Sequence, residues 1–394
     1  MAKNGFRAMD SDLHVIEPVD LWDRYLDPEF KKYAPNIYRP PNVTGVGLAE
    51  YAGVAYPTCD INTRERYMGM GVGAGDEARA PMRARNHDGQ SQLDAMNIEG
   101  LDVGINFPTV GLYLPLGTER IEPEVSWAMC RAWNDWIYDF CKVDSKRMKP
   151  CAILPMHNPF MAAKEARRAV NELGAVTVFI RPNFLGGRPW HSRYWDPVWS
   201  TLQELDVAIG LHEGTGTDYF QDGSEFGENR LMRHACSHPI GMMKAMISFI
   251  CGGVLETFPR LRVAFLEANT GWLPYWLSRM DRDVQNYGKF DAPQLKLTPK
   301  EYFLRNCWVG CEGDDTELKY VIDAVGDDNI VFSTDFPHHD TEFPHAIDEF
   351  LELEMADESK RKILWDNCVR LYGLDQNGQQ QRSPQPQAVK RKAA

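Results

Sequence analysis

The segment MDSDLHVIEP, residues 9–18, places several carboxylates and an imidazole on a stretch with the composition of a buried strand. Asp12 and His14 are two residues apart, and side chains with this spacing point to the same face of a β-strand. Charged groups inside a fold need ion pairs, hydrogen bonds or a bound cation. The segment therefore predicts part of a metal site. Glu17 follows the strand and is a further candidate ligand, with pairing to an arginine as the alternative.

Apolar, β-rich segments recur along the chain, and helical patterns lie between most of them. The candidate strands cover 6–15, 102–108, 149–155, 175–182, 207–214, 262–268, 307–313 and 329–337. The candidate helices cover 122–142, 159–173, 194–205, 239–257, 271–288, 316–325 and 357–371. Alternating strands and helices are typical of parallel sheets, and eight such units predict an α/β fold, a (β/α)8 TIM barrel. A doubly wound sheet is the alternative, but no GxGxxG motif follows the first strand.

The expected organisation is a single barrel domain over residues 1–375. A long insertion at 19–100 follows the first strand and is rich in proline, glycine and arginine. Long insertions of this kind are usually lids or contact elements. Residues 376–394 contain mainly Gln, Pro, Lys and Arg, which predicts a disordered C-terminal tail.

Polar residues at the carboxyl ends of the strands are the best candidates for chemistry, because barrel active sites lie at that rim. His212, Glu267 and Asp335 end the fifth, sixth and eighth candidate strands, and His338 follows Asp335. His238 opens the candidate helix 239–257. Each has a structural alternative as a core histidine, a helix cap or a loop residue. For His234 a surface or structural role is favoured.

The composition narrows the class of protein. The formal net charge of −13 argues against nucleic acid or an anionic membrane as the main partner. Nine cysteines without a CxxC motif suggest reduced thiols rather than a disulfide framework or a zinc knuckle. Neither a signal peptide nor a long apolar run is recognisable, so we expect a cytoplasmic protein.

From about residue 8 to 373 the chain resembles amidohydrolase-related enzymes of the aminocarboxymuconate-semialdehyde decarboxylase type. The resemblance rests on DSDLHVIEP, GLHEG, FSTDFPHHD, LWDNCVRLYGL and the long stretch SHPIGMMKAMISFICGGVLETFPRLRVAFLEANTGWLPYWLSRMD. It implies a (β/α)8 barrel with a bound divalent metal. By resemblance the metal ligands are Asp12, His14, His212 and Asp335, and Asp335 is the general base.

The chain also departs from that family pattern. The first motif is Asp-x-His instead of His-x-His or Glu-x-His, and Glu267 stands where the family usually has a histidine. With His238 and His338 added, the candidate ligands suffice for two metals. Mixed oxygen and imidazole ligands suit iron and manganese as well as zinc. This variant resembles a smaller branch in which the barrel holds a dinuclear iron or iron–manganese centre.

Two enzyme functions follow from these resemblances. The favoured one is a monooxygenase that activates O2 and hydroxylates a C–H bond of a small carboxylic or amino acid, supplied with electrons by a separate donor. The alternative is a hydrolase or non-oxidative decarboxylase of a small carboxylate, which tolerates zinc. In either case Asp335, His238 and Glu267 are the expected catalytic residues, and Arg181 is the expected ligand of the substrate carboxylate. The resemblance also implies a homo-oligomer, or a heteromer with a related barrel subunit; a non-catalytic subunit is the least favoured reading.

Overall fold

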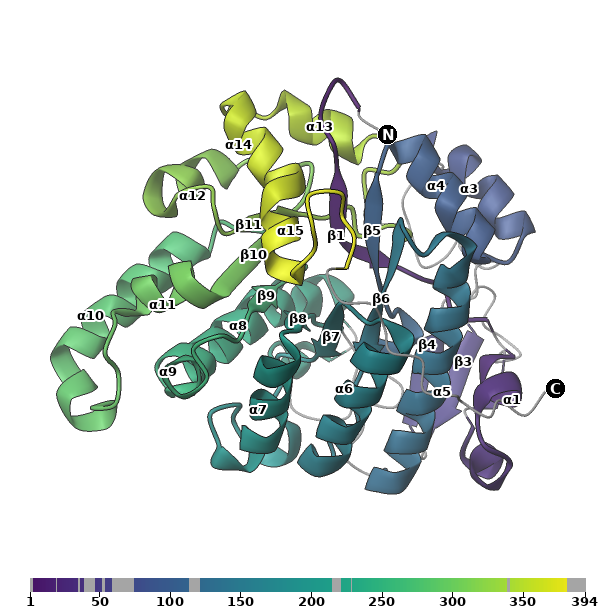
Figure 1. The fold of residues 1–394 in the computed structure, drawn as a ribbon, viewed down its shortest axis with the longest axis horizontal. Coiled ribbons are helices and arrows are strands. Elements are labelled where there is room, and N and C mark those ends of the chain that lie inside the picture. Colours follow the sequence, from purple (N-terminus) through teal and green to yellow (C-terminus); the bar gives the residue numbers. More distant parts are fainter. Residues whose placement is uncertain are drawn as a thin grey trace.

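Eight parallel strands form one nearly closed barrel (Figure 1), in the order β1-β5-β6-β7-β8-β9-β10-β11. The computed structural model describes residues 3–18, 20–34, 36–38, 47–51, 54–58, 74–112, 121–214, 221–227, 229–338 and 341–380. The barrel strands are β1 Met9–His14, β5 Val103–Phe107, β6 Met148–Ile153, β7 Thr177–Ile180, β8 Ala208–Leu211, β9 Val263–Phe265, β10 Cys307–Cys311 and β11 Ile330–Phe332. Each overlaps one predicted range, so the predicted TIM barrel is confirmed.

Side-chain and loop hydrogen bonds join the first strand to the last strand and the segment after it. The Ser11 hydroxyl donates to the carbonyl of Phe332 at 2.7 Å, and the His14 amide donates to the carbonyl of Phe336 at 2.7 Å. The buried Asp10 carboxylate accepts from the amide of Thr334 at 3.2 Å and also from its hydroxyl. These bonds bring the end of β1, which carries Asp12, and the segment after β11, which carries Asp335, together at one rim.

Helices form the outer layer of the barrel: α5 Pro123–Cys141, α6 Pro159–Leu173, α7 Asp196–Leu205, α8 Arg230–Ile250, α10 Leu273–Asp291, α11 Pro299–Asn306, α12 Leu318–Val325, α13 Ala346–Glu352, α14 Asp357–Arg361 and α15 Asn367–Tyr372. Helix α6 illustrates why the predicted boundaries hold. The Asn158 side chain accepts from the amides of Phe160 and Met161, and Pro159 occupies the first turn. Gly174, with φ 71°, ends the helix in the left-handed conformation.

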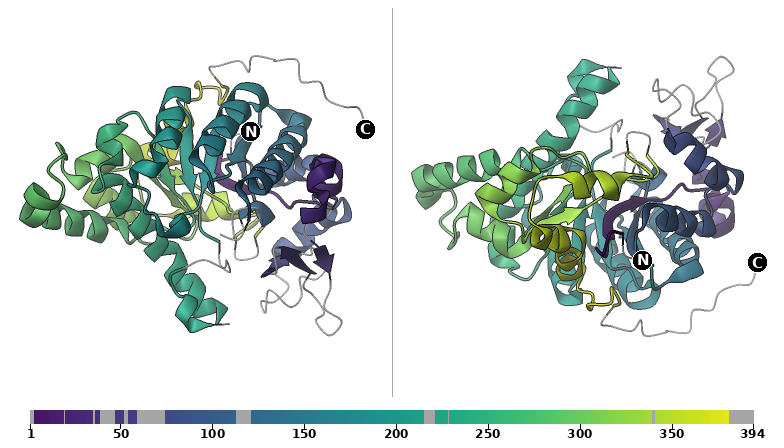
Figure 2. Two further views of the ribbon diagram at one scale, coloured as in Figure 1. Left: turned by 90° about the horizontal axis from the view of Figure 1, so that it is seen from below. Right: turned by 90° about the horizontal axis from the view of Figure 1, so that it is seen from above.

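Helix α8 begins earlier than predicted. The expected start was at 239, but the helix begins at Arg230 and continues through Pro239. Asn229 caps its N-terminus by accepting a hydrogen bond from the amide of Met232. The first turns of α8 extend away from the barrel (Figure 2). The chain then forms a separate short helix, α9 Val254–Thr257.

The insertion after β1 contains regular structure. It includes α1 Leu21–Tyr25, the strands β2 Asn36–Tyr38, β3 Gly47–Tyr51 and β4 Val54–Thr58, and the helices α3 Ala74–Ala84 and α4 Gly89–Glu99. Strands β2, β3 and β4 pair antiparallel. The Arg79 guanidinium of α3 donates to the carbonyl of His338 at 3.1 Å and to the Thr341 hydroxyl at 2.7 Å. The insertion therefore contacts the loop after β11.

The C-terminal segment stays against the barrel beyond residue 375. The Gln380 side-chain amide donates to the carbonyl of Gly174 at 2.6 Å, and that of Gln379 donates to the carbonyl of Lys146 at 3.0 Å. The rest of the predicted tail, 381–394, lies outside the described residues. Within the ranges that the structure describes, no helix has the length and apolar character needed to span a membrane.

Candidate metal centre

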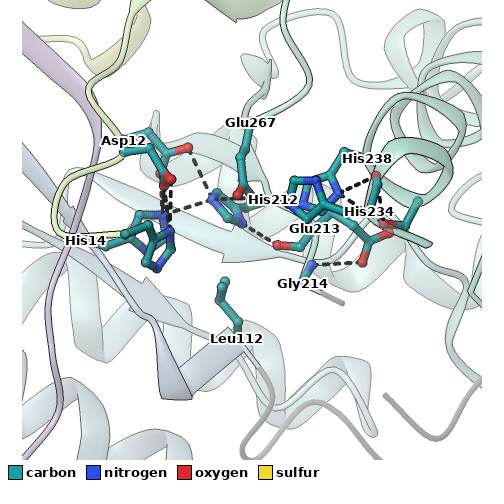
Figure 3. Close-up of polar contacts among 12 residues, drawn as sticks. Asp12, His14, Leu112, His212, Glu213, Gly214, His234, His238 and Glu267 are labelled. Atoms are coloured by element: carbon teal, nitrogen blue, oxygen red, sulfur yellow. Dashed lines mark hydrogen bonds and ion pairs between the residues drawn. The ribbon is translucent and has the colours of Figure 1, made fainter. Parts of the chain in front are cut away.

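Two histidines from opposite strands meet at the carboxyl-end rim of the barrel (Figure 3). The Nε2 atoms of His14 and His212 are 2.9 Å apart, and both side chains are fully buried. The Nδ1 atom of His14 lies 2.7 Å from the carbonyl of Pro108, and that of His212 lies 2.6 Å from the carbonyl of Glu213. Because a carbonyl can only accept, each Nδ1 carries a proton, and in the neutral ring each Nε2 presents a lone pair.

Three carboxylates surround this pair of nitrogens. Asp12 places one oxygen 3.3 Å from Nε2 of His14 and the other 3.3 Å from Nε2 of His212. Oδ1 of Asp335 is 3.2 Å from Nε2 of His14, and Oε2 of Glu267 is 3.2 Å from Nε2 of His212. Both Asp12 oxygens and Oδ1 of Asp335 are buried and receive no hydrogen bond within the described part of the chain.

This arrangement fits a divalent metal. Two lone pairs 2.9 Å apart cannot hydrogen-bond to each other, and buried carboxylate oxygens without donors are costly. A cation among Asp12, His14, His212 and Asp335 would satisfy all of these atoms, with the backbone carbonyls holding the imidazoles in the ligating tautomer. The ligand atoms fall into two sets within 4.8 Å: Asp12, His14 and His212 in one, and His212, Glu267 and Asp335 in the other.

The charges of the site are strongly coupled. Burial raises the pKa of Asp12, but the neighbouring His212 and His14 rings outweigh burial and hold that pKa below its usual value. Burial lowers the pKa of His14, but the Asp12 and Asp335 carboxylates outweigh it and raise that pKa well above the usual value. Each carboxylate and imidazole of the centre therefore favours the charged form of its neighbour.

The backbone at two of the carboxylates is in an uncommon conformation. Glu267 has φ 47° and Asp335 has φ 52°, in the left-handed region that residues other than glycine rarely adopt. Such a conformation costs on the order of 1–3 kcal/mol per residue, and it tends to occur at functional sites. Glu267 lies two residues after β9 and Asp335 three residues after β11, so both carboxylates lie at the carboxyl-end rim of the barrel.

His338 contacts the centre through Asp335. Its Nδ1 lies 2.8 Å from Oδ1 of Asp335, and its Nε2 lies 3.1 Å from the Thr109 hydroxyl. The ring also packs on His14, with centroids 4.1 Å apart. His14, Asp335 and His338 form a further set of ligand-type atoms within 4.8 Å.

The structure does not bring Glu17 into these sets. Its Oε1 accepts hydrogen bonds from the amides of Thr109 and Gly111, at 3.2 and 2.8 Å, and from the indole of Trp133 at 2.9 Å. Glu17 therefore joins the segment after β1 to the loop after β5.

We expect Glu17→Ala to lower the free energy of unfolding by about 2 kcal/mol or more, because it leaves three donors without this acceptor. Urea denaturation checks the loss, and Glu17→Gln, which keeps an acceptor oxygen, should lose less. A parallel measurement of bound metal should give wild-type metal content for both variants. A loss of metal from either variant would instead support the prediction that Glu17 is a metal ligand.

Arg181 lies in a buried polar network behind His212. Its guanidinium pairs with the Glu213 carboxylate and donates to the carbonyl of Leu112 at 3.0 Å and of Gly214 at 2.6 Å. It also donates to Oδ1 of Asn183 at 3.0 Å. With these acceptors around it, the guanidinium holds the residues flanking His212 in place, and binding of a substrate carboxylate by Arg181 stays a prediction.

Arg181→Met is expected to lower the free energy of unfolding by about 3–5 kcal/mol, because it leaves the Glu213 carboxylate buried without its cation. Urea denaturation measures this loss. Arg193→Met is the matched control, since Arg193 pairs with Asp196 on the surface and its side chain is 94% exposed. Equal losses in the two variants would show that the buried pair has no special structural role.

Two residues at the centre lie outside the predicted site. His234 lies one helical turn before His238 and belongs to a fourth set with His238 and Glu267. Glu312 directly follows β10; burial raises its pKa well above the ordinary value, and Asp335 and Glu267 add to the effect. The position of Glu312 at a strand end was a usable sequence signal. His234 was missed because the predicted helix started at 239, so the sequence did not place His234 and His238 on one helix face.

The fold and the site together define a metal-dependent barrel enzyme. The family described as "Amidohydrolase" matches residues 10–374, and the chain belongs to this family. A γ-resorcylate decarboxylase from Rhizobium sp. (strain MTP-10005) is 28% identical over 72% of this chain and 85% of its own length. A 2-amino-3-carboxymuconate-6-semialdehyde decarboxylase from Dictyostelium discoideum is 24% identical over 65% of this chain and 69% of its own.

A solved structure shows the same fold. The dihydroxybenzoic acid decarboxylase from Polaromonas sp. JS666, with bound manganese and the inhibitor 2-nitroresorcinol, superposes with a TM-score of 0.62 at 20% identity. The match covers 93% of this chain and 97% of that one. These relatives support the resemblance to decarboxylases and give no support to the oxygenase branch.

Proposed function

We propose that this protein is a non-oxidative decarboxylase of a small aromatic carboxylate with a hydroxyl group beside the carboxylate. The observation that carries the proposal is the pair of facing imidazole nitrogens, 2.9 Å apart, among carboxylate oxygens that lack donors. The decarboxylase relatives make this the reaction of first choice. Their names give 2,6-dihydroxybenzoate as the probe substrate, and manganese is the metal to test first.

The proposed reaction breaks the bond between the ring carbon and the carboxyl carbon. The electron pair stays on the ring carbon, which takes up one proton, and CO2 leaves. A divalent metal at Asp12, His14, His212 and Asp335 would supply positive charge that holds the anionic substrate. We assign the delivery of that proton to Asp335, whose Oδ2 lies within hydrogen-bonding distance, 3.0 Å, of Nδ1 of His338.

A substrate comparison tests the proposal. The manganese-loaded protein is incubated under nitrogen with 2,6-dihydroxybenzoate, and resorcinol is quantified by chromatography. 3,5-Dihydroxybenzoate, which has no hydroxyl group beside the carboxylate, is the matched control. We expect resorcinol from the first compound and no product from the second. Absence of product from 2,6-dihydroxybenzoate and from other ortho-hydroxybenzoates would refute the proposal.

A second candidate function is the O2-activating hydroxylase of a small carboxylic or amino acid. One observation favours it: Glu267 belongs both to the set around His212 and to the set around His238, as expected for a carboxylate shared by two iron or manganese ions. This reaction would need O2 and a separate electron donor. Oxygen uptake by the iron-loaded protein with a chemical reductant and a panel of small acids distinguishes it from decarboxylation, which uses no O2.

A further inference from the structure

Asp10 is a buried carboxylate of β1 that the proposed chemistry does not use. Its side chain has no exposed surface, and it lies two residues before Asp12. Its Oδ1 accepts hydrogen bonds from the amide of Asp12 at 3.0 Å and from the amide of Thr334 at 3.2 Å, and its Oδ2 accepts from the Thr334 hydroxyl. Because Thr334 directly precedes Asp335, all three bonds end on segments that carry a proposed metal ligand.

The bond to the Asp12 amide coincides with an irregularity in β1. The pairing of β1 with β5 shifts its register between Asp10 and Leu13. Irregularities of this kind often re-aim a side chain next to an active site, and an aspartate that accepts from the amide two residues later favours such a local turn. The Asp12 oxygens receive no hydrogen bond within the described part of the chain. Their position therefore depends on the backbone that Asp10 holds.

Asp10 acts on Asp335 through Thr334. The Thr334 hydroxyl donates to the Asp10 carboxylate and accepts a hydrogen bond from the amide of Phe336 at 3.2 Å. This hydroxyl thus bridges the two residues that flank Asp335, whose backbone is in the left-handed region with φ 52°. An uncommon backbone conformation persists only where its surroundings determine it, and the bridge provides such a constraint.

The structural alternative for Asp10 is that it only joins the first strand to the last. Ser11 already does this, because its hydroxyl donates to the carbonyl of Phe332, a residue of β11 itself, at 2.7 Å. The bonds of Asp10 do not reach β11 and end instead at Asp12 and Thr334. This difference separates a residue that links strands from one that positions ligands.

We propose that Asp10 is a positioning residue of the metal centre. It holds the ligands Asp12 and Asp335 in place relative to each other, one through its own amide and the other through Thr334. Residues that orient metal ligands without touching the metal contribute about 10–100-fold to metal affinity. The inference rests on the metal centre of the proposed function, but it does not depend on which reaction that centre performs.

The affinity for Mn²⁺ tests this role without an activity assay. The full chain is stripped with a chelator and titrated with Mn²⁺, and the free ion is quantified by its electron paramagnetic resonance spectrum. We expect the dissociation constant to rise about 10–100-fold in Thr334→Val, which keeps the shape of the side chain but removes the hydroxyl between Asp10 and Phe336. Thr334→Ser retains the hydroxyl and should bind Mn²⁺ as the wild type does.

Asp10→Asn should weaken Mn²⁺ binding by a similar factor, since its amide nitrogen cannot accept from the Thr334 hydroxyl. Both variants break the same bond, so their effects should not multiply in the double variant Asp10→Asn/Thr334→Val. Ser11→Ala is the matched control, because it removes a buried hydrogen bond between β1 and β11. It should keep wild-type Mn²⁺ affinity, although urea denaturation should show a lower free energy of unfolding.

Wild-type affinity in either Thr334→Val or Asp10→Asn would overturn the role of Asp10. An equal loss of affinity in Ser11→Ala would also overturn it, because the effect would then be a general loss of stability. Absence of decarboxylation by a protein that binds Mn²⁺ would refute the proposed reaction and leave the role of Asp10 intact. A wild type that binds no Mn²⁺ would refute both proposals.

Discussion

Asp335→Asn is expected to lower kcat for decarboxylation by about 10³-fold, within the range usual for loss of a group that transfers a proton. The amide is nearly the same size, but it cannot take up and release the proton that the ring carbon needs. His338 would keep its place against Thr109, so the fold around the site should survive. Steady-state kinetics with the manganese-loaded variant measure the loss.

The control for this variant is Asp323→Asn, an exposed aspartate on α12 that should leave kcat unchanged. Metal content must be measured for both variants. If Asp335→Asn loses manganese, the lower rate results from weaker metal binding and says nothing about proton transfer. Wild-type kcat in Asp335→Asn with bound metal would contradict the assigned proton transfer.

Asp12→Ala is expected to abolish both tight metal binding and activity. Asp12 supplies two buried oxygens without donors, one facing His14 and one facing His212, so no other residue replaces it. In the wild type, Mn²⁺ at about 100 times its dissociation constant should raise the free energy of unfolding by about 2.7 kcal/mol. Urea denaturation with and without Mn²⁺ measures this gain, which Asp12→Ala should lose.

Asp20→Ala provides the comparison, since Asp20 is exposed and forms a surface pair with Arg24. That variant should keep the full stabilisation by Mn²⁺. Stabilisation of Asp12→Ala equal to that of the wild type would mean that the ion binds elsewhere.

The barrel and most of its centre could be predicted because parallel strands with both faces buried appear in sequence as apolar segments. Polar residues at the ends of such segments then stand out, as Asp12, His14, His212, Glu267 and Asp335 do. The barrel places all these ends on one rim, so the grouping of these residues follows from the fold class without exact element boundaries.

The remaining features depended on tertiary contacts that leave little trace in sequence. The predicted helix began at 239, yet α8 begins at Arg230 behind the Asn229 cap, more than two turns earlier, and so includes His234. Glu17 resembled a ligand by type and spacing, but its partners come from the loop after β5. The prediction for Arg181 likewise did not anticipate Glu213, the neighbour of His212, as its buried partner.

The most direct test of the proposed function follows isotope labels from the substrate and the solvent into the products of a single reaction. 2,6-Dihydroxybenzoate with ¹³C in its carboxyl group is incubated in D2O, without O2, with the manganese-loaded protein. Decarboxylation predicts ¹³CO2 and resorcinol in equal amounts, with one deuterium on the ring carbon that carried the carboxyl group. Unchanged substrate here, together with O2-dependent hydroxylation of an acid by the iron-loaded protein, would contradict the decarboxylase and establish the second candidate.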